Sequence, residues 1–330
     1  MGHALIRSDA RVLVVSSGMA GHEINCIGVA EALGIPYKKI IVAPRAIFKR
    51  LAPYGPVDPK DSPKRPGSVL APPFPDIVIA SGRVTVPYIR AFKRAGGDKV
   101  FAVFLQDPRY AKREFDLIWA PLHDELAGAN VIATLTSPHP FSAARLERLR
   151  QTPDPRIAAL PSPRAAIILG GPSAAHGFVA ADLERMTKAA RDIAAQGYSV
   201  MATPSRRTPP ELLAAVRKGL EAADPARTFV WDGAGDNPYG AMLAQADAIL
   251  VTGDSVNMVG EAVATGAPVH VFRPSGGGKR IDAFLAGLRK TGAARVFEGE
   301  LETFSYEPID SSRTIAAAIA ERFGAKGGAR

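Results

Sequence analysis

Short runs of β-branched and apolar residues alternate along the chain with longer amphipathic stretches. The short runs predict six strands in each half of the sequence, and this alternation is typical of βα repeats around a parallel sheet. The expected strands are Val12–Ser16, Lys39–Val42, Asp76–Ala80, Val100–Leu105, Leu117–Ala120, Val131–Thr134, Ala165–Leu169, Ser199–Ala202, Thr228–Trp231, Ala248–Val251, Val269–Phe272 and Arg295–Phe297.

The longer stretches place apolar residues at helical spacing and predict the intervening helices. The expected helices are His22–Leu33, Val86–Ala95, Phe141–Arg150, Val179–Ala195, Pro210–Ala222, Pro238–Gln245, Val256–Thr265, Ile281–Lys290 and Ser311–Phe323.

Two proline-rich segments interrupt the pattern. Eight prolines lie between Ala52 and Pro75, which indicates a loop: either a plain surface connection or a place for acceptor contacts. Four more lie in Gln151–Pro163, which we interpret as an interdomain linker. The sequence therefore predicts an α/β protein with two doubly wound, Rossmann-like domains, 1–155 and 156–330. Such domains bind ligands at the carboxyl ends of their strands, so the expected site is the cleft between them.

Composition argues against a membrane-spanning protein and against a secreted one. The chain has 330 residues, 47% of them hydrophobic, yet no apolar run reaches the roughly 20 residues that a membrane span requires. The segment Met1–Ala10 lacks the apolar core of a signal peptide. The single cysteine, Cys26, cannot form an internal disulfide. These features predict a cytoplasmic protein.

The net charge of +9 is concentrated in the first half. Residues 1–160 contain 22 Lys and Arg against 14 Asp and Glu, whereas the remainder contains 19 against 18. A basic first domain would suit an anionic membrane face or an acidic ligand, and it would allow peripheral attachment to the inner face of a membrane. An ordinary solvated basic surface explains the same charge. Nucleic acid is not expected as a partner, because no basic helix is interleaved with aromatic residues.

The first expected strand ends in a turn with Gly18, Gly21 and His22. Its G-x-x-G spacing allows close backbone approach to a ligand but is not the full dinucleotide fingerprint. His22 stands where a general base could act, although a histidine that merely packs at the helix start would look the same. Asp107 and Arg109 follow another strand, and Asp107 is either a second base candidate or a turn residue.

In the second half, Gly170, Gly171 and Ser173 follow the first strand, and their pattern suits a phosphate contact or an ordinary turn. The next strand leads into Ser205, Arg206 and Arg207. Arginine recognises phosphate in a bidentate manner, so these side chains are candidate ligand contacts.

The segment 251–262 is the most informative one in the chain. Asp254 and Ser255 are candidate helix N-caps. Asn257 and Glu261 share one helix face, with Met258 between them. Glu261 interrupts an otherwise apolar helix and needs a partner, for which a ribose diol or an internal arginine would serve.

A later loop, Arg273–Arg280, combines Ser275 and Gly276 with two further glycines, and two cations, Lys279 and Arg280, follow this glycine run. It resembles a phosphate loop chemically but lacks the spacing of an ATPase motif. The histidines and the cysteine make no ligand pair at helical spacing, so no metal site is expected. The G-x-S-x-G hydrolase elbow is absent from the sequence.

Taken together, these motifs resemble one family. The motifs that carry the resemblance are Gly-x-x-Gly-His after the first strand, Phe104–Arg109, Ser205–Pro209, and Thr-Gly-Asp-Ser-x-Asn-Met-x-x-Glu-Ala at 252–262. They are similar to those of the plant "elongated mitochondria" fission factor and its bacterial relatives, over roughly 12–297. That family is in turn similar to GT-B glycosyltransferases of the MurG type.

The resemblance implies residue roles. Glu261 would bind the ribose of a nucleotide diphosphate sugar, of the uridine type, which would be a substrate rather than a cofactor. By the same resemblance, the nucleotide diphosphate would be lined by Gly170, Gly171, Ser173, Arg206, Ser255 and Asn257. Further nucleotide-sugar-binding candidates, from their positions in the same loops and turns, are Gly18, Gly21, Ser205, Arg207, Asp254, Met258, Ser275 and Gly276. His22 would be the base.

Two functions are compatible with these features. The first is an inverting transfer of a sugar to a membrane-associated or cell-envelope acceptor, with His22 or Asp107 deprotonating the acceptor hydroxyl and Arg206 stabilising the diphosphate. The second is a non-catalytic adaptor of the fission-family type, which keeps a vestigial nucleotide pocket and acts at a membrane surface.

Overall fold

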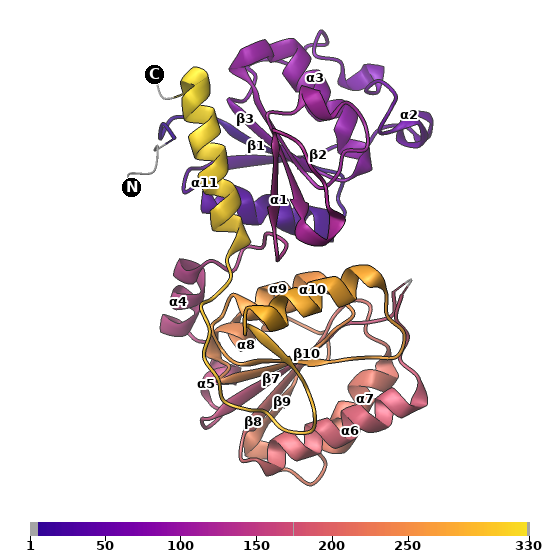
Figure 1. Cartoon of the computed structure of the whole chain (residues 1–330), viewed down its shortest axis with the longest axis vertical. Coiled ribbons are helices and arrows are strands. Elements are labelled where there is room, and N and C mark those ends of the chain that lie inside the picture. Colours follow the sequence, from indigo (N-terminus) through magenta and orange to yellow (C-terminus); the bar gives the residue numbers. More distant parts are fainter. Residues whose placement is uncertain (1–5, 174, 329–330) are drawn as a thin grey trace. The chain divides into compact units, whose positions relative to one another are not determined.

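The computed structural model describes residues 6–173 and 175–328, and the chain divides into two compact units. The first unit contains the chain up to Pro140 together with the segment from Asp310 onward, and the second is Phe141–Ile309. Each unit has its own six-stranded sheet covered by helices on both faces (Figure 1).

The first sheet has the strand order β2-β1-β3-β4-β5-β6, and every neighbouring pair is parallel. Its strands are β1 (Val12–Ser16), β2 (Tyr37–Ile41), β3 (Ile77–Ser81), β4 (Phe101–Leu105), β5 (Leu117–Pro121) and β6 (Val131–Thr134). The helices of this unit are α1 (Ala20–Ala32), α2 (Ala46–Leu51), α3 (Val86–Gly96) and α11 (Ser311–Phe323).

The central strands β3, β4 and β5 of the first sheet are buried on both faces because helices cover both. Val12 and Val14 pack on the side of α1 and α11, whereas Val15, which points the other way, packs on the side of α3. The terminal helix α11 contributes Ile315 and Ile319 to the first of these clusters. It appears as the yellow helix beside the upper sheet in Figure 1.

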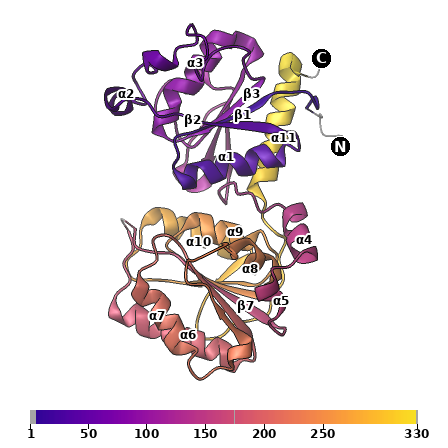
Figure 2. The ribbon, with the colours of Figure 1, turned by 180° about the vertical axis from the view of Figure 1, so that it is seen from behind.

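The second sheet has the order β12-β11-β10-β7-β8-β9 and is also parallel throughout. Its strands are β7 (Arg164–Leu169), β8 (Ser199–Pro204), β9 (Thr228–Val230), β10 (Ala248–Thr252), β11 (Val269–Phe272) and β12 (Ala294–Val296). The helices are α4 (Ala143–Gln151), α5 (Pro155–Ala158), α6 (Ala180–Ala195), α7 (Pro210–Gly219), α8 (Tyr239–Gln245), α9 (Val256–Val263) and α10 (Lys279–Lys290). Figure 2 shows α6 and α7 on one face of this sheet and α9 and α10 on the other.

The division of the chain differs from the expected domains 1–155 and 156–330 at both ends of the second unit. Helix α4 belongs to the second unit, where Arg150 Nε donates to the Ala244 carbonyl at 3.1 Å. Helix α11 belongs to the first, because its apolar face completes that core and because Ser312 Oγ donates to the His139 carbonyl at 2.7 Å. An amphipathic pattern predicts that a helix is buried but not which sheet buries it.

The predicted α/β class, with two doubly wound, Rossmann-like units, is confirmed. The proline-rich stretch 52–75 lacks long elements, as expected, and contains one 3-10 turn, Pro59–Asp61. Helix α2 was not expected from the sequence. None of the helices formed by residues 6–173 and 175–328 combines the length and apolar character that a membrane span requires.

Candidate functional site

The first unit presents His22 at the carboxyl edge of its sheet. His22 lies in the first turn of α1, directly after β1, and its Nδ1 is 3.1 Å from Ser81 Oγ at the end of β3. The Ser81 hydroxyl donates to the Leu105 carbonyl at 2.7 Å. Burial lowers the pKa of His22, so the imidazole is neutral near pH 7. A neutral, half-buried histidine in this position is suited to accept a proton.

The turn that precedes His22 is held by its own side chains. The Gly18 amide donates to Ser16 Oγ at 2.9 Å, and the Ser16 hydroxyl donates to Glu23 Oε2 at 2.6 Å. Lys39 pairs with the other Glu23 oxygen at 2.6 Å. The hydrogen bonds from Lys39 and Ser16 lower the pKa of Glu23. The Gly18 amide is therefore engaged within the turn, while Gly21, inside α1, is exposed.

Asp107, the second base candidate, anchors a strained loop. Its Oδ1 accepts from the Arg109 amide at 2.8 Å, and Lys112 lies 3.2 Å from the same carboxylate. Gln106, Arg109 and Ala111 all adopt positive φ angles, which side-chain-bearing residues rarely do. These contacts give Asp107 a local structural role.

In the second unit, the glycine pair after β7 is packed against Asp254. The Gly170 amide donates to Thr252 Oγ1 at 2.7 Å, and the Gly171 amide donates to Asp254 Oδ2 at 3.0 Å. A Cβ at position 170 would lie 2.2 Å from the Asp254 carboxylate oxygens. Both residues must therefore be glycine for packing reasons, and both amides are bonded within the protein.

Asp254 itself points inward. Its side chain is fully buried, and Arg207 lies 3.6 Å from Oδ2. Its Oδ1 is buried without a hydrogen-bond partner in the described part of the chain. Ser255 instead caps α9, since its Oγ accepts from the Met258 amide at 3.4 Å. Of the two predicted caps, Ser255 is confirmed.

Two neighbouring loops are joined around Ser173. Its Oγ accepts from the His176 amide at 3.1 Å, and His176 forms a bridge with Gly276. The Ser275 amide donates to the buried Asp182 carboxylate at 3.0 Å. These contacts connect the loop after β7 with the glycine-rich loop after β11 and fix the positions of both.

The loop after β8 carries two exposed arginines, Arg206 and Arg207. The Ser205 amide donates to Thr208 Oγ1 at 2.8 Å, which closes the turn. Arg207 pairs with Asp254 at 3.6 Å although half of its side chain is exposed. Over residues 6–173 and 175–328, the Arg206 guanidinium has no hydrogen bond or ion pair. Of the two predicted arginines, Arg206 is the one available to a ligand.

Glu261 is buried on α9 with a tyrosine as partner. Tyr239, the first residue of α8, donates its hydroxyl to Glu261 Oε2, and its ring packs edge-on against Phe141 with centroids 5.6 Å apart. Burial raises the pKa of Glu261 to about 7, while the bond from Tyr239 opposes this shift. Burial likewise raises the pKa of Tyr239. The sequence suggested ribose or arginine as the partner and missed Tyr239, which lies 22 residues away.

Comparison with known proteins identifies the family. The sequence profile described as "Mitochondrial fission ELM1" matches residues 20–323. The chain belongs to the mitochondrial fission ELM1 family. The "Mitochondrial fission protein ELM1" of Arabidopsis thaliana is 29% identical over 279 residues, which cover 77% of this chain and 65% of the plant protein. An uncharacterised protein of Rickettsia prowazekii is 32% identical over 135 residues, 37% of each chain. The chain thus spans less than two thirds of the length of either relative.

Solved structures share the fold of this ELM1 family member. The UDP-GlcNAc 2-epimerase of Methanocaldococcus jannaschii superposes with a TM-score of 0.55 at 12% identity, covering 94% of this chain and all of that one. MurG of Acinetobacter baumannii gives a TM-score of 0.47 at 15% identity, covering 96% of this chain and 93% of that one. The family and the fold expected from the sequence are both confirmed.

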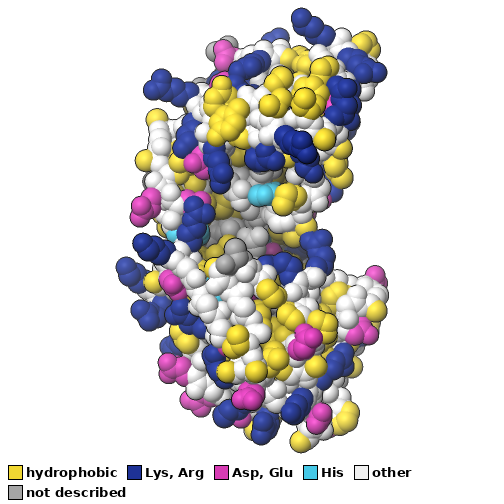
Figure 3. All heavy atoms as spheres, turned by 90° about the vertical axis from the view of Figure 1, so that its right-hand side faces the viewer, with side chains coloured by type: hydrophobic (Ala, Val, Ile, Leu, Met, Phe, Trp, Pro, Cys, Tyr) yellow, Lys and Arg dark blue, Asp and Glu magenta, His cyan; other side chains and the backbone are white. Residues whose placement is uncertain are grey.

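The ELM1 family member also carries a surface that the sequence motifs did not indicate. We call it the α2 surface, and it consists of exposed apolar side chains among cations. Its apolar members are Met19, Ile41, Ile47, Leu51, Tyr54 and Tyr110, each at least 40% exposed. Tyr54 and Tyr110 pack edge-on at 5.3 Å. In Figure 3, apolar and basic side chains lie intermixed over the upper, first unit.

An ion pair between the exposed Arg45 and the buried Asp58 holds α2 in place. Arg45, which precedes the helix, donates from its amide and its guanidinium to Asp58, at 2.9 and 2.8 Å. Asp58 is fully buried, and the bonds from Arg45 hold the pKa of its carboxyl well below the usual range. The proline-rich segment that contains Asp58 therefore supports α2 from beneath.

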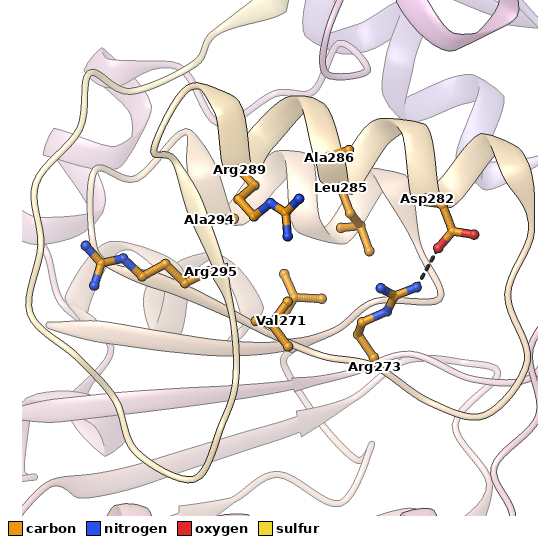
Figure 4. A pocket seen from close by; sticks show the side chains of 9 residues that line it. Val271, Arg273, Asp282, Leu285, Ala286, Arg289, Ala294 and Arg295 are labelled. Atoms are coloured by element: carbon orange, nitrogen blue, oxygen red, sulfur yellow. Dashed lines mark hydrogen bonds and ion pairs between the residues drawn. The ribbon is translucent and has the colours of Figure 1, made fainter.

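A cavity of about 300 Å³ lies in the second unit between β11, β12 and α10. Arg273 and Arg289 point toward it above Val271, and the Arg295 guanidinium points away (Figure 4). Arg273 pairs with Asp282 at 2.5 Å. The charge of Arg273, which opens the glycine-rich loop, is thus neutralised within the protein. Within the described ranges, no group of three or more His, Cys, Asp and Glu side chains could hold a metal ion.

Proposed function

We propose that this protein binds a nucleotide diphosphate sugar and transfers its sugar, with inversion, to an acceptor hydroxyl. The observation that carries the proposal is the setting of His22, which is half-buried and, among the residues that the structure describes, hydrogen-bonded only through Nδ1, while burial lowers its pKa. Nε2 would accept the acceptor's proton while the acceptor oxygen attacks the anomeric carbon. The bond from that carbon to the diphosphate then breaks, and the electron pair leaves with the diphosphate.

The second unit would hold the donor. Arg206 and the free amides in the first turn of α9 would stabilise the departing diphosphate, since a helix N-terminus and a guanidinium both favour negative charge. Glu261 would accept from the ribose through the oxygen that Tyr239 does not use. Because the amides of Gly170 and Gly171 are bonded internally, we assign the diphosphate contacts to Arg206 and α9 instead.

We further propose that the α2 surface places the protein on an anionic membrane from the cytoplasmic side. Exposed apolar side chains surrounded by cations suit the boundary between lipid headgroups and acyl chains. Sedimentation with vesicles of phosphatidylserine and phosphatidylcholine tests this, with vesicles of phosphatidylcholine alone as the comparison. Ile47→Ser should weaken the binding, whereas Val179→Ser, at a similarly exposed apolar residue of the second unit, should not. Equal sedimentation of both variants and the wild type would refute the membrane role.

A specific observation favours the alternative, a non-catalytic adaptor with a vestigial nucleotide pocket. The buried Asp254 carboxylate lies against Gly170 and Gly171, where a phosphate-binding loop would otherwise offer free amides. A negative charge at this position disfavours a diphosphate at the glycine pair. An adaptor would need the α2 surface but not His22.

A thermal-shift screen separates the two functions. The probes are the diphosphates of uridine, guanosine, adenosine and cytidine together with their sugars, beginning with UDP-GlcNAc, on which the Methanocaldococcus neighbour acts by its name. A ligand at 100 times its Kd adds about 2.7 kcal/mol of stability, which is readily detected. Glu261→Ala should abolish the shift, and Glu184→Ala, an exposed glutamate of the same unit, should leave it unchanged. If no probe shifts the melting temperature, the transferase proposal fails and the adaptor remains.

A further inference from the structure

His22 has two ring nitrogens in different surroundings. Nδ1 contacts the Ser81 hydroxyl at 3.1 Å, and Ser81, at the end of β3, is only 1% exposed. Nε2 makes no hydrogen bond to any residue that the structure describes. In a neutral imidazole one nitrogen carries the proton and the other accepts, so the surroundings decide which is which.

The Ser81 hydroxyl determines the direction of its bond to the ring. Ser81 has a single hydroxyl proton, and the Leu105 carbonyl, 2.7 Å away, can only accept it. Ser81 and Leu105 are also register partners of adjacent parallel strands, so the sheet fixes this distance. With its proton committed to Leu105, Ser81 Oγ can only accept from His22, and Nδ1 must therefore be the protonated nitrogen.

Gly82, the residue after Ser81, keeps Nε2 of His22 accessible. A Cβ at Gly82 would lie 3.1 Å from His22 Cδ2 and 3.4 Å from Nε2. Gly82 also has a φ of 90°, a conformation that L side chains rarely adopt. Ser81 and Gly82 thus act on opposite sides of one ring: the serine occupies Nδ1, and the glycine leaves room at Nε2.

We infer that Ser81 is a positioning residue, which fixes His22 as the Nδ1–H tautomer and directs the lone pair of Nε2 toward a substrate hydroxyl. The chemical purpose of this arrangement rests on the proposed transferase function, but the tautomer is a property of the free protein. In the transfer step, Nε2 takes the proton of the acceptor and the resulting imidazolium keeps its Nδ1–H bond to Ser81. Ser81 itself neither gains nor loses a proton.

The tautomer can be measured directly in the full chain labelled with ¹⁵N-histidine. At pH 8, two-bond ¹H–¹⁵N correlation spectra distinguish a pyrrole-type nitrogen from a pyridine-type nitrogen, and the His22→Gln variant identifies the His22 signals. We expect a pyrrole-type Nδ1 and a pyridine-type Nε2 in the wild type. A protonated Nε2 in the wild type overturns the inference, even if no serine variant can be made.

Ser81→Ala should shift the ratio of the two tautomers toward Nε2–H by about fivefold, the effect of losing one neutral hydrogen bond. The matched control is Thr85→Val, because Thr85 donates within the same turn, to the Ser81 and Gly82 carbonyls, without contacting His22. The control should retain the wild-type tautomer. An unchanged tautomer in Ser81→Ala, or an equal shift in Thr85→Val, refutes a specific role of Ser81.

The outcomes separate this inference from the proposed function. If the His22 signals show Nδ1–H but no nucleotide raises the melting temperature, the transferase proposal fails and the positioning role of Ser81 stands. If a nucleotide binds at Glu261 but Nε2 carries the proton, the nucleotide site stands and the inference about Ser81 fails.

Discussion

Replacing Glu261 by glutamine should stabilise the second unit, and more so as the pH rises. The carboxyl is buried, and its pKa is raised from 4.5 to about 7 because burial disfavours the charged form. Because the pKa is higher in the folded state than in the unfolded one, the protonated carboxyl makes its full contribution to stability below pH 4.5. This contribution is lost as the pH rises through about 7. Glutamine remains neutral at every pH and can still accept from Tyr239.

The size of the effect follows from the shift of the pKa. The difference between 4.5 and about 7 corresponds to about 3 kcal/mol once the carboxyl is ionised. Glu261→Gln should therefore be more stable than the wild type by about 3 kcal/mol at pH 8 and by only about 1 kcal/mol at pH 5.5. The diagnostic feature is that the difference in stability between the variant and the wild type grows from pH 5.5 to pH 8.

Urea unfolding provides the assay. Each unit contains one tryptophan, so a Trp119→Phe background leaves Trp231 as the reporter of the second unit. Glu184→Gln makes the same charge change at an exposed position and should stay within about 0.5 kcal/mol of the wild type at both pH values. A Glu261→Gln variant with no gain at pH 8, or with a stability difference that does not grow with pH, would show that burial does not raise the pKa of Glu261.

Three further changes test the described contacts. Tyr239→Phe removes the only described hydrogen bond to Glu261 Oε2 and should cost about 2 kcal/mol at pH 8 in the same urea assay; an unchanged midpoint would contradict the pairing. Asp58→Asn should speed hydrogen exchange of the α2 amides roughly tenfold, because a neutral amide accepts the hydrogen bonds of Arg45 more weakly than a carboxylate does. Unchanged exchange would mean that other contacts hold α2 in place. Gly170→Ala should cost about 1–3 kcal/mol, since its Cβ would meet Asp254 at 2.2 Å, and a neutral result in urea would disprove that crowding.

The sequence allowed the fold to be predicted because local patterns determine it. Runs such as Val12–Ser16 and Ala248–Val251 are apolar on both faces, as parallel strands between two helix layers must be. Helix α2 was missed since its six residues are too few to show a helical period, and its N-cap Arg45 makes no side-chain cap bond. The position of α11 was missed because burial depends on a core that is distant in sequence.

The candidate site was only partly predictable for the same reason. The turn sequence identified Ser255 as a helix cap, because capping is a local interaction. The inward direction of Asp254 depends on the Gly171 amide, which is 83 residues away. Likewise, the contact of His22 with Ser81 spans 59 residues. A single sequence contains no signal for such pairs beyond the presence of suitable residue types.

In the proposed function, the second unit holds a nucleotide diphosphate through Arg206, the first turn of α9 and Glu261. A crystal structure of the full chain at saturating concentration of whichever nucleotide raises the melting temperature tests it most directly. We predict that the diphosphate lies within hydrogen-bond distance of the Arg206 guanidinium and the α9 amides, with a ribose hydroxyl on Glu261. A nucleotide bound elsewhere, with Glu261 still held by Tyr239 alone and Arg206 without a ligand, would contradict the account.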